Sequence, residues 1–182
     1  HNAAAVAQLF FQGEFSDGIY KTRQHISEQQ AYGRYRELEK LDRSNVLENS
    51  IYETSKRMHF IDTSCPVIRR NCPVFFSQPV VVLADSLTAS AAESFLSSMK
   101  YRDRAVILGE ASYGSNGQPL LGDLPGGGYY GINTQVCQLP DGTEYEYTGI
   151  QPDYPIEVTL ADYMNGYDRI LAEGLQTIRG MC

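Results

Sequence analysis

Residues 79–109 decide the fold, and they read PVVVLADSLTASAAESFLSSMKYRDRAVILG. The run Val80–Ala84 is continuously apolar and rich in β-branched residues, as a strand buried on both faces of a sheet requires. Residues 89–100 combine small side chains with larger apolar ones at helical spacing, which predicts a helix packed closely on that sheet. Ala105–Gly109 is a second apolar strand. The stretch therefore predicts a parallel, right-handed βαβ unit.

The chain begins with an apolar helical pattern at Ala3–Phe11. Asn2 is a candidate N-cap and Gly13 a candidate C-terminal stop. A helix this apolar must be covered by other elements, and it resembles the second half of a strand–helix unit. We therefore expect the chain to be an N-terminally truncated fragment or a processed form.

A polar, Tyr-bearing segment follows at about residues 19–72. It opens with a candidate short strand at Ile19–Ile26, and its remainder has no clean helical or strand period. We expect an insertion or lid on a single core domain that spans residues 1–182. A solvated helical arm is the alternative.

The second half of the chain changes to Gly-rich turns and Tyr-rich strands. Gly126–Gly128 and the pair Asp141-Gly142 are turn signals around a candidate strand at Tyr129–Val136, which predicts antiparallel hairpins at one rim. Residues 162–179 predict a closing helix whose apolar stripe we expect to be core. That stripe consists of Met164, Tyr167, Ile170, Leu171, Leu175 and Ile178.

Composition excludes several classes of protein. The formal charge is −7, and ten of the fifteen Lys and Arg residues fall between Lys21 and Arg70, so nucleic acid is a disfavoured partner. No apolar stretch approaches the roughly 18 residues that a membrane-spanning helix needs. No spacing points to a metal or an organic cofactor. The four cysteines, Cys65, Cys72, Cys137 and Cys182, form neither a zinc motif nor a disulfide framework, and pairing of Cys65 with Cys72 is left open.

Ser90 stands where the first predicted strand passes into the helix. At this edge of an open α/β sheet side chains reach the crevice outside the strand's carboxyl end. Free N–H groups such as that of Ala91, together with the helix dipole, would stabilise an oxyanion formed by attack of a serine oxygen on a carbonyl. The alternative is structural, because Ser90-x-x-Glu93 also fits a capping box. The Gly-x-Ser-x-Gly elbow is not present.

Four ordered motifs carry a family resemblance: TASAAESF at 88–95, GEASYG at 109–114, LPDG at 139–142 and GIQPD at 149–153. Together they resemble the S41 tail-specific (C-terminal processing) serine peptidases. The resemblance implies a ClpP/crotonase-like α/β fold that binds an extended peptide along the sheet rim. It also implies Ser90 as the nucleophile and the Ala91 N–H in the oxyanion hole.

One departure concerns the catalytic base. In the family's Ser/Lys branch a lysine lies in the loop that aligns with Gly114–Gly117, and this chain has Ser115 there. Lys100 is almost three helical turns from Ser90 and is too far away to replace it. Within this loop Gly114 and Ser115 are the candidate substrate-binding residues.

The chain is more similar to the tricorn-type branch, which has a Ser-His-Ser-Glu tetrad. Glu146 best matches its glutamate, with Glu144 as a register alternative, and both are equally compatible with ordinary exposed strand positions. His1, His25 and His59 match no motif, so we expect the base to be a histidine from outside this chain. Glu110 either lines the same crevice or has a capping or ion-pair role.

These observations predict a serine-type peptidase that cleaves unstructured or C-terminal polypeptide segments through an acyl-enzyme. An upstream domain or another chain of the same protein is the expected partner, an oligomer is compatible with the sequence, and the resemblance implies an extracytoplasmic location. A noncatalytic module that binds peptides or apolar ligands on the same fold is the alternative. A crotonase-like acyl-CoA enzyme is disfavoured by the Pro-Asp-Gly and Pro-Asp motifs.

Overall fold

The computed structural model describes residues 2–22, 44–45, 67–68 and 72–181. Most of the predicted insertion, the three histidines, Cys65 and Cys182 lie outside these residues. The chain divides into two compact units. The described residues of the first are 2–19, 67–68, 72–116 and 137–181, and those of the second are 20–22, 44–45 and 117–136.

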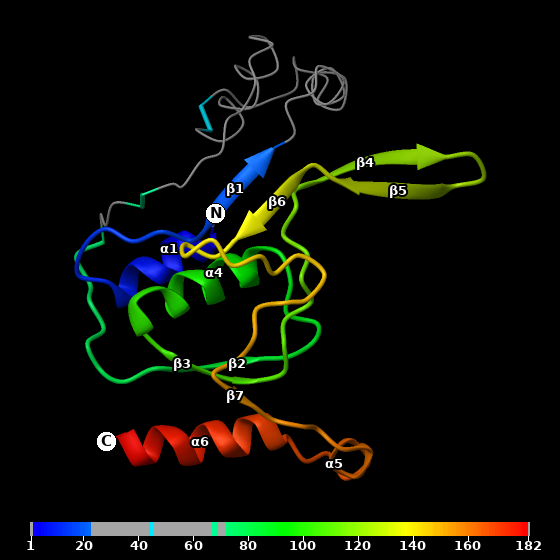
Figure 1. Ribbon diagram of the computed structural model, residues 1–182. Helices are drawn as coiled ribbons and strands as arrows, with labels where there is room; N and C mark the ends of the chain where they lie inside the picture. The colour runs from blue at the N-terminus through cyan, green and yellow to red at the C-terminus, as the bar shows by residue number, and fades with distance from the viewer. Residues whose placement is uncertain (1, 23–43, 46–66, 69–71, 182) are drawn as a thin grey trace. The chain divides into compact units, whose positions relative to one another are not determined.

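The first unit is built on a parallel sheet of three strands in the order β2-β3-β7 (Figure 1). Strand β2 (Val81–Ala84) pairs along its whole length with β3 (Val106–Gly109), and helix α4 (Ala91–Lys100) connects them. This confirms the predicted parallel βαβ unit. The third strand, β7 (Tyr154–Pro155), is only two residues long and gives no periodic signal in the sequence.

Helices cover both faces of this sheet (Figure 1). On one face α4 packs with α1 (Asn2–Ala7), which continues as a 3₁₀ turn, η1 (Gln8–Phe10). This confirms the predicted N-terminal helix, but Asn2 is a residue of the helix rather than its N-cap, and the helical segment ends before Gly13. A second 3₁₀ turn, η3 (Tyr101–Asp103), ends α4. On the other face lies α6 (Arg169–Met181), which contacts β2 and β3. This α/β layering matches the predicted fold class.

The core on the α1 side is apolar and closely packed. Its buried members are Ala7, Phe11, Phe15, Met99 and Ala105. The Met99 side chain is completely buried, and removing a buried methionine side chain typically costs about 2–5 kcal/mol. The burial of these apolar residues explains why α1 and α4 stay together.

Arg104 fastens the N-terminal segment to the end of α4. Its Nε donates to the carbonyl oxygen of Phe10 at 2.6 Å, and its Nη2 donates to the carbonyl oxygen of Phe76 at 2.6 Å. The guanidinium also lies 5.7 Å from the centre of the Phe10 ring, close enough for a cation–π contact. One side chain therefore joins three segments that are distant in the sequence.

The expectation that β2 is buried on both faces is only partly right. Ala84 is buried, but Leu83 is 39% exposed. The α6 helix approaches this strand closely at Gly174, where a Cβ would lie 2.6 Å from Leu83 Cδ2, yet Leu83 stays partly exposed beside it. The α6 face of the sheet is therefore less completely covered than the α4 face.

The expectation of one C-terminal helix at residues 162–179 was wrong. The structure has two helices, α5 (Leu160–Met164) and α6, because Gly166 at φ +64° ends the first. The predicted stripe is not buried core either, although Ile170 and Ile178 are half-buried. Its members Met164, Tyr167, Leu171 and Leu175 are 45–78% exposed, and the buried residue of α6 is Gly174.

The second unit holds an antiparallel hairpin of β4 (Pro119–Leu124) and β5 (Gly128–Asn133). Its turn uses Gly126 and Gly127, both at positive φ, which confirms the predicted Gly-rich turn. A separate two-stranded sheet pairs β1 (Ile19–Thr22) with β6 (Gln135–Gln138). The boundary between the two units along the sequence falls inside each of these two strands.

Hydrogen bonds also close the predicted Asp141-Gly142 turn. The N–H of Leu139 donates to the Thr143 carbonyl at 2.9 Å, and Gly142 adopts φ +90°. The Thr143 N–H donates to the Asp141 carboxylate at 2.8 Å, which lowers the pKa of that carboxyl.

None of the helices in the described residues is long and apolar enough to cross a membrane.

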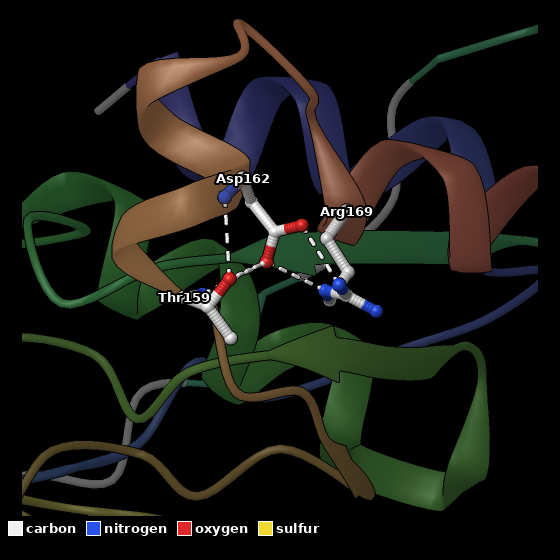
Figure 2. A network of polar contacts seen from close by, with 3 residues as sticks. All are labelled: Thr159, Asp162 and Arg169. Atoms are coloured by element: carbon white, nitrogen blue, oxygen red, sulfur yellow. Dashed lines mark hydrogen bonds and ion pairs between the residues drawn. The ribbon is translucent and has the colours of Figure 1, made fainter.

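A carboxylate network connects α5 to the start of α6 (Figure 2). Asp162 is buried and accepts two hydrogen bonds from Arg169, at 2.8 Å from Nε and 2.7 Å from Nη2. The Thr159 hydroxyl donates to the same carboxylate at 2.6 Å. The bonds from Arg169, followed by those from Thr159, hold the pKa of Asp162 well below its ordinary value of 3.8.

This network predicts an acid-sensitive contribution to stability. Because the pKa of Asp162 is lowered by folding, its contribution is complete above the ordinary value and is lost as the pH falls below that value. The Asp162→Asn variant should therefore have a lower melting temperature than the wild type at pH 7. This gap in melting temperature should narrow as the pH falls toward 2. Thermal melts of both proteins from pH 7 to pH 2 measure this gap. An Arg169→Met background should shrink it, and a gap that does not change with pH would contradict the assignment.

Candidate active site

Ser90 follows a turn that connects β2 to α4 and is stabilised by its own hydrogen bonds. The Thr88 N–H donates to the Asp85 carbonyl at 3.0 Å, and the Thr88 hydroxyl donates to the Asp85 carboxylate at 2.9 Å. Ser90 then forms the N-cap of α4 and is exposed. The predicted position of Ser90, between the carboxyl end of β2 and the helix, is confirmed, although this strand is only partly buried.

The backbone of Ser90 has an unusual conformation. Its φ is +56° and its ψ is −122°, whereas an N-cap residue usually has extended backbone angles. A residue other than glycine in such a region costs about 1–3 kcal/mol and persists only where its surroundings hold it there. Capping alone therefore does not account for this geometry.

The carboxylate of Glu93 is one group that holds Ser90. Glu93 is completely buried, and its Oε2 accepts the N–H of Ser90 at 3.1 Å and the N–H of Ser115 at 3.0 Å. Its Oε1 accepts the N–H of Gly114 and the hydroxyl of Ser112, both at 2.6 Å. These four donors offset the cost of removing a carboxylate from water. The capping-box alternative is thus confirmed as geometry, but the same glutamate also binds a distant loop.

Ser115 lies beside Ser90, as its alignment with the family's lysine position implies. Besides donating to Glu93, Ser115 accepts the N–H of Ser90 on its carbonyl oxygen at 3.0 Å. The structure therefore brings the predicted substrate-binding residues Gly114 and Ser115 together with the predicted nucleophile. Their role in binding substrate stays a prediction.

Ser112 connects this network to the Gly-x-x-Pro-Asp motif. Its hydroxyl accepts the N–H of Ile150 at 2.7 Å, and its own N–H donates to the Ile150 carbonyl at 3.2 Å. Gly149 must be a glycine here, because it adopts φ +74° and a Cβ would lie 1.9 Å from the Ser112 carbonyl oxygen. The motif therefore supports the loop that contacts Ser90.

Lys100 has a structural role at the far end of α4. Its Nζ lies 2.8 Å from the Asp153 carboxylate and donates to the Gln151 carbonyl at 2.9 Å. Asp153 also accepts the N–H of Ile107 at 2.8 Å, which ties the Gly-x-x-Pro-Asp motif to β3. This agrees with the expectation that Lys100 cannot act as the base for Ser90.

The N–H of Ala91 is available for a ligand. In the part of the chain that the structure describes, no group accepts a hydrogen bond from it. Ala91 and Ala92 are exposed beside Ser90, and the positive end of the α4 dipole lies at the same place. An oxyanion next to Ser90 would find a free donor here, as the sequence predicts.

Glu146 is half-buried on the neighbouring loop, and the structure does not place it in hydrogen-bond contact with Ser90. The hydrogen bonds that Ser90 makes to described residues involve Glu93, Ser94 and Ser115. Burial, followed by the charge of Glu146, raises the pKa of the Cys137 thiol to about 12. A role for Glu146 in a tetrad therefore stays a prediction. The alternative, Glu144, is exposed and accepts from Gln138 Nε2 at 2.9 Å.

The remaining candidate groups are Glu110, the described cysteines and any possible metal ligands. The Glu110 carboxylate accepts the N–H of Ser86, in the turn before α4, at 3.2 Å, and its predicted alternatives stay predictions. Cys72 and Cys137 are free thiols. Among the described residues, no group of three or more His, Cys, Asp and Glu residues is placed to hold a metal ion.

Sequence reasoning missed two members of this site. It treated Glu93 only as half of a capping box, and it did not single out Ser112. The available signal for Glu93 was the Ser-x-x-Glu spacing, but its other three donors come from residues 19–22 positions later in the chain. A periodic sequence pattern does not predict hydrogen bonds between residues so far apart in the chain.

Comparison with known proteins gives the family. The chain matches the profile of peptidase family S41 over residues 1–156. The chain belongs to this family. It is 31% identical over 96 residues to the carboxy-terminal-processing protease of Bartonella bacilliformis, which covers 53% of this chain and 22% of that protein. It is also 30% identical over 80 residues to carboxyl-terminal-processing peptidase 2, chloroplastic, of Arabidopsis thaliana, which covers 44% of this chain and 16% of that protein.

A solved structure supports the S41 fold. The structure of mature CPAF complexed with lactacystin aligns with 98% of this S41 chain and 42% of its own, at 16% identity and a TM-score of 0.67. At this identity the likeness concerns the fold alone. The S41 chain matches less than a quarter of the length of the two curated relatives, so its sites are assigned residue by residue.

The close approach at Gly149 predicts a large effect of one methyl group. Gly149→Ala should destabilise the protein more than Gly142→Ala, because both glycines have positive φ but only at 149 would the Cβ meet backbone. Left-handed strain alone costs about 1–2 kcal/mol, so the Gly142→Ala variant should lose that amount and Gly149→Ala distinctly more. Urea unfolding of the two variants measures both losses. Equal losses would show that Ser112 does not lie against Gly149 in solution.

Proposed function

We propose that this chain carries the nucleophile of a serine endopeptidase that acts on unstructured or C-terminal polypeptide segments. The observation that carries the proposal is the geometry of Ser90. This exposed serine is held at positive φ on the N-terminus of α4, next to the free N–H of Ala91. Membership of family S41 and the names of the curated relatives support this reaction and substrate class.

The reaction proceeds through an acyl-enzyme. The Ser90 Oγ attacks the carbonyl carbon of the scissile peptide while its proton passes to a general base. The carbonyl oxygen becomes an oxyanion, which accepts a hydrogen bond from the Ala91 N–H. The C–N bond then breaks, the leaving amine takes the proton from the base, and an ester to Ser90 remains. Water, deprotonated by the same base, hydrolyses that ester and frees the serine.

The base in this proposal is a histidine outside this chain, contributed by an upstream domain, by another chain of the same protein or by a partner subunit. The Lys100–Asp153 ion pair supports this proposal, because it holds Lys100 away from Ser90. Glu146 is the proposed acidic member of a tricorn-type tetrad, which orients the base through an intervening serine.

The substrate in this proposal is an extended polypeptide that contacts the loop of Gly114 and Ser115. Both residues lie beside Ser90 on the same carboxylate, which supports a shared binding site. An extracytoplasmic location is part of the proposal, in line with relatives from a bacterium and a chloroplast. Cell fractionation tests the location separately from activity.

Labelling with a fluorophosphonate probe tests the proposal. The probe is applied to this chain and to the longest polypeptide that contains it, and mass spectrometry locates the modified residue. We expect labelling at Ser90 that is lost in Ser90→Ala and unchanged in Ser86→Ala, an exposed serine in the preceding turn. His25→Ala and His59→Ala should not alter labelling if the base lies outside this chain. Absence of labelling in both polypeptides would contradict a peptidase and favour a binding module.

A further inference from the structure

We propose that Glu93 is the positioning residue for Ser90: its buried carboxylate holds Ser90 and the Gly114–Ser115 loop on one acceptor and so fixes the nucleophile relative to the substrate-binding loop. This inference rests on the proposed function for its catalytic meaning. Its geometry can be tested independently of any activity.

The two oxygens of Glu93 hold different parts of the site. Oε2 accepts the N–H groups of Ser90 and Ser115, at 3.1 and 3.0 Å. Oε1 accepts from Gly114 and Ser112, both at 2.6 Å. The carboxylate therefore bonds to the nucleophile's own backbone on one side and to the supporting loop on the other.

The positive φ of Ser90 requires such a restraint. The Ser90 N–H donates to both Glu93 Oε2 and the Ser115 carbonyl, and Glu93 lies in the helix that follows Ser90, so a change in the φ of Ser90 would move this carboxylate away from the N–H. This one N–H is shared between a buried carboxylate and a carbonyl oxygen, and losing both acceptors would leave it unpaired, which opposes relaxation of the positive φ. The residue with the strained backbone angle, Ser90, is thus the one whose N–H these two acceptors hold.

The role of Glu93 exceeds that of an ordinary helix cap. A capping-box glutamate returns to the N–H of the cap residue alone, and an exposed position would suffice for that bond. Glu93 is completely buried and accepts three further bonds from residues 112–115. In the described part of the chain no Lys or Arg pairs with it, so directional hydrogen bonds hold it in place.

One consequence concerns the oxyanion. Because the Ser90 N–H is bonded to Glu93 and Ser115, the free donor at this turn is the N–H of the next residue, Ala91. The restraint on Ser90 also determines where the Ala91 N–H points. A shift of about 1 Å in such an arrangement can cost about a hundredfold in rate.

Two conservative variants separate reach from charge. Glu93→Gln keeps the length of the side chain and the oxygen that accepts from Ser90 and Ser115. Its Nε2 would face Ser112, whose hydroxyl can turn to accept, but also the N–H of Gly114, so that one hydrogen bond is lost. Glu93→Asp keeps the charge but shortens the side chain by one carbon, about 1.5 Å. We expect the rate of fluorophosphonate labelling at Ser90 to fall less in Glu93→Gln, which keeps the acceptor of the Ser90 N–H, than in Glu93→Asp, where it should fall about tenfold or more.

Asp162→Asn supplies the matched control, because it removes a buried carboxylate of another network and should lower the melting temperature without changing the labelling rate. All rates are measured well below each melting temperature. Labelling of Glu93→Asp at the wild-type rate would overturn the proposal. So would losses in the two Glu93 variants that follow only their melting temperatures.

A measurement without activity distinguishes failure of this inference from failure of the proposed function. If no wild-type polypeptide is labelled, the proposed function fails, and the amide resonances of Ser90, Gly114 and Ser115 still report on the geometry. In ¹H–¹⁵N NMR spectra, the Ser90 and Ser115 resonances should stay near their wild-type positions in Glu93→Gln and move in Glu93→Asp. Unmoved resonances in Glu93→Asp would overturn the positioning role.

Discussion

The site depends on one buried carboxylate that has only neutral partners among the described residues. Glu93 cannot leave the interior without exposing its four donors, and it cannot remain there without them, since an unpaired buried carboxylate is prohibitively costly. This mutual requirement joins the start of α4 to a loop about twenty residues later. Ser90 is part of that arrangement, and its unusual backbone angle follows from it.

The motifs that mark the family act largely as supports for this arrangement. In the last motif, Gly149 allows a backbone approach that no side chain would permit, and Ile150 bonds to Ser112, which in turn bonds to Glu93. Asp153 of the same motif ties the chain to β3 through the N–H of Ile107 and holds Lys100. In this chain the last motif thus supports the loop that contacts Ser90.

Sequence patterns predicted the parts of the fold that are local or periodic. The βαβ unit, the Gly-rich hairpin and the place of Ser90 followed from apolar runs and turn residues, since these depend on neighbouring positions. The break at Gly166 and the exposed stripe of α6 did not follow, because periodicity records a helix face without saying what covers it. The hydrogen bonds of Glu93 were out of reach for a similar reason, as they join segments whose register only the folded chain sets.

Amide hydrogen exchange, followed by NMR on the wild-type chain, tests the central claim most directly. Ser90 and Ala91 are adjacent, yet the first N–H is bonded to Glu93 and Ser115 while the second is free of described acceptors. The account predicts that the amides of Ser90, Gly114 and Ser115 exchange slowly, at similar rates, and that the Ala91 amide exchanges much faster. A Ser90 amide that exchanges as fast as that of Ala91 would contradict it.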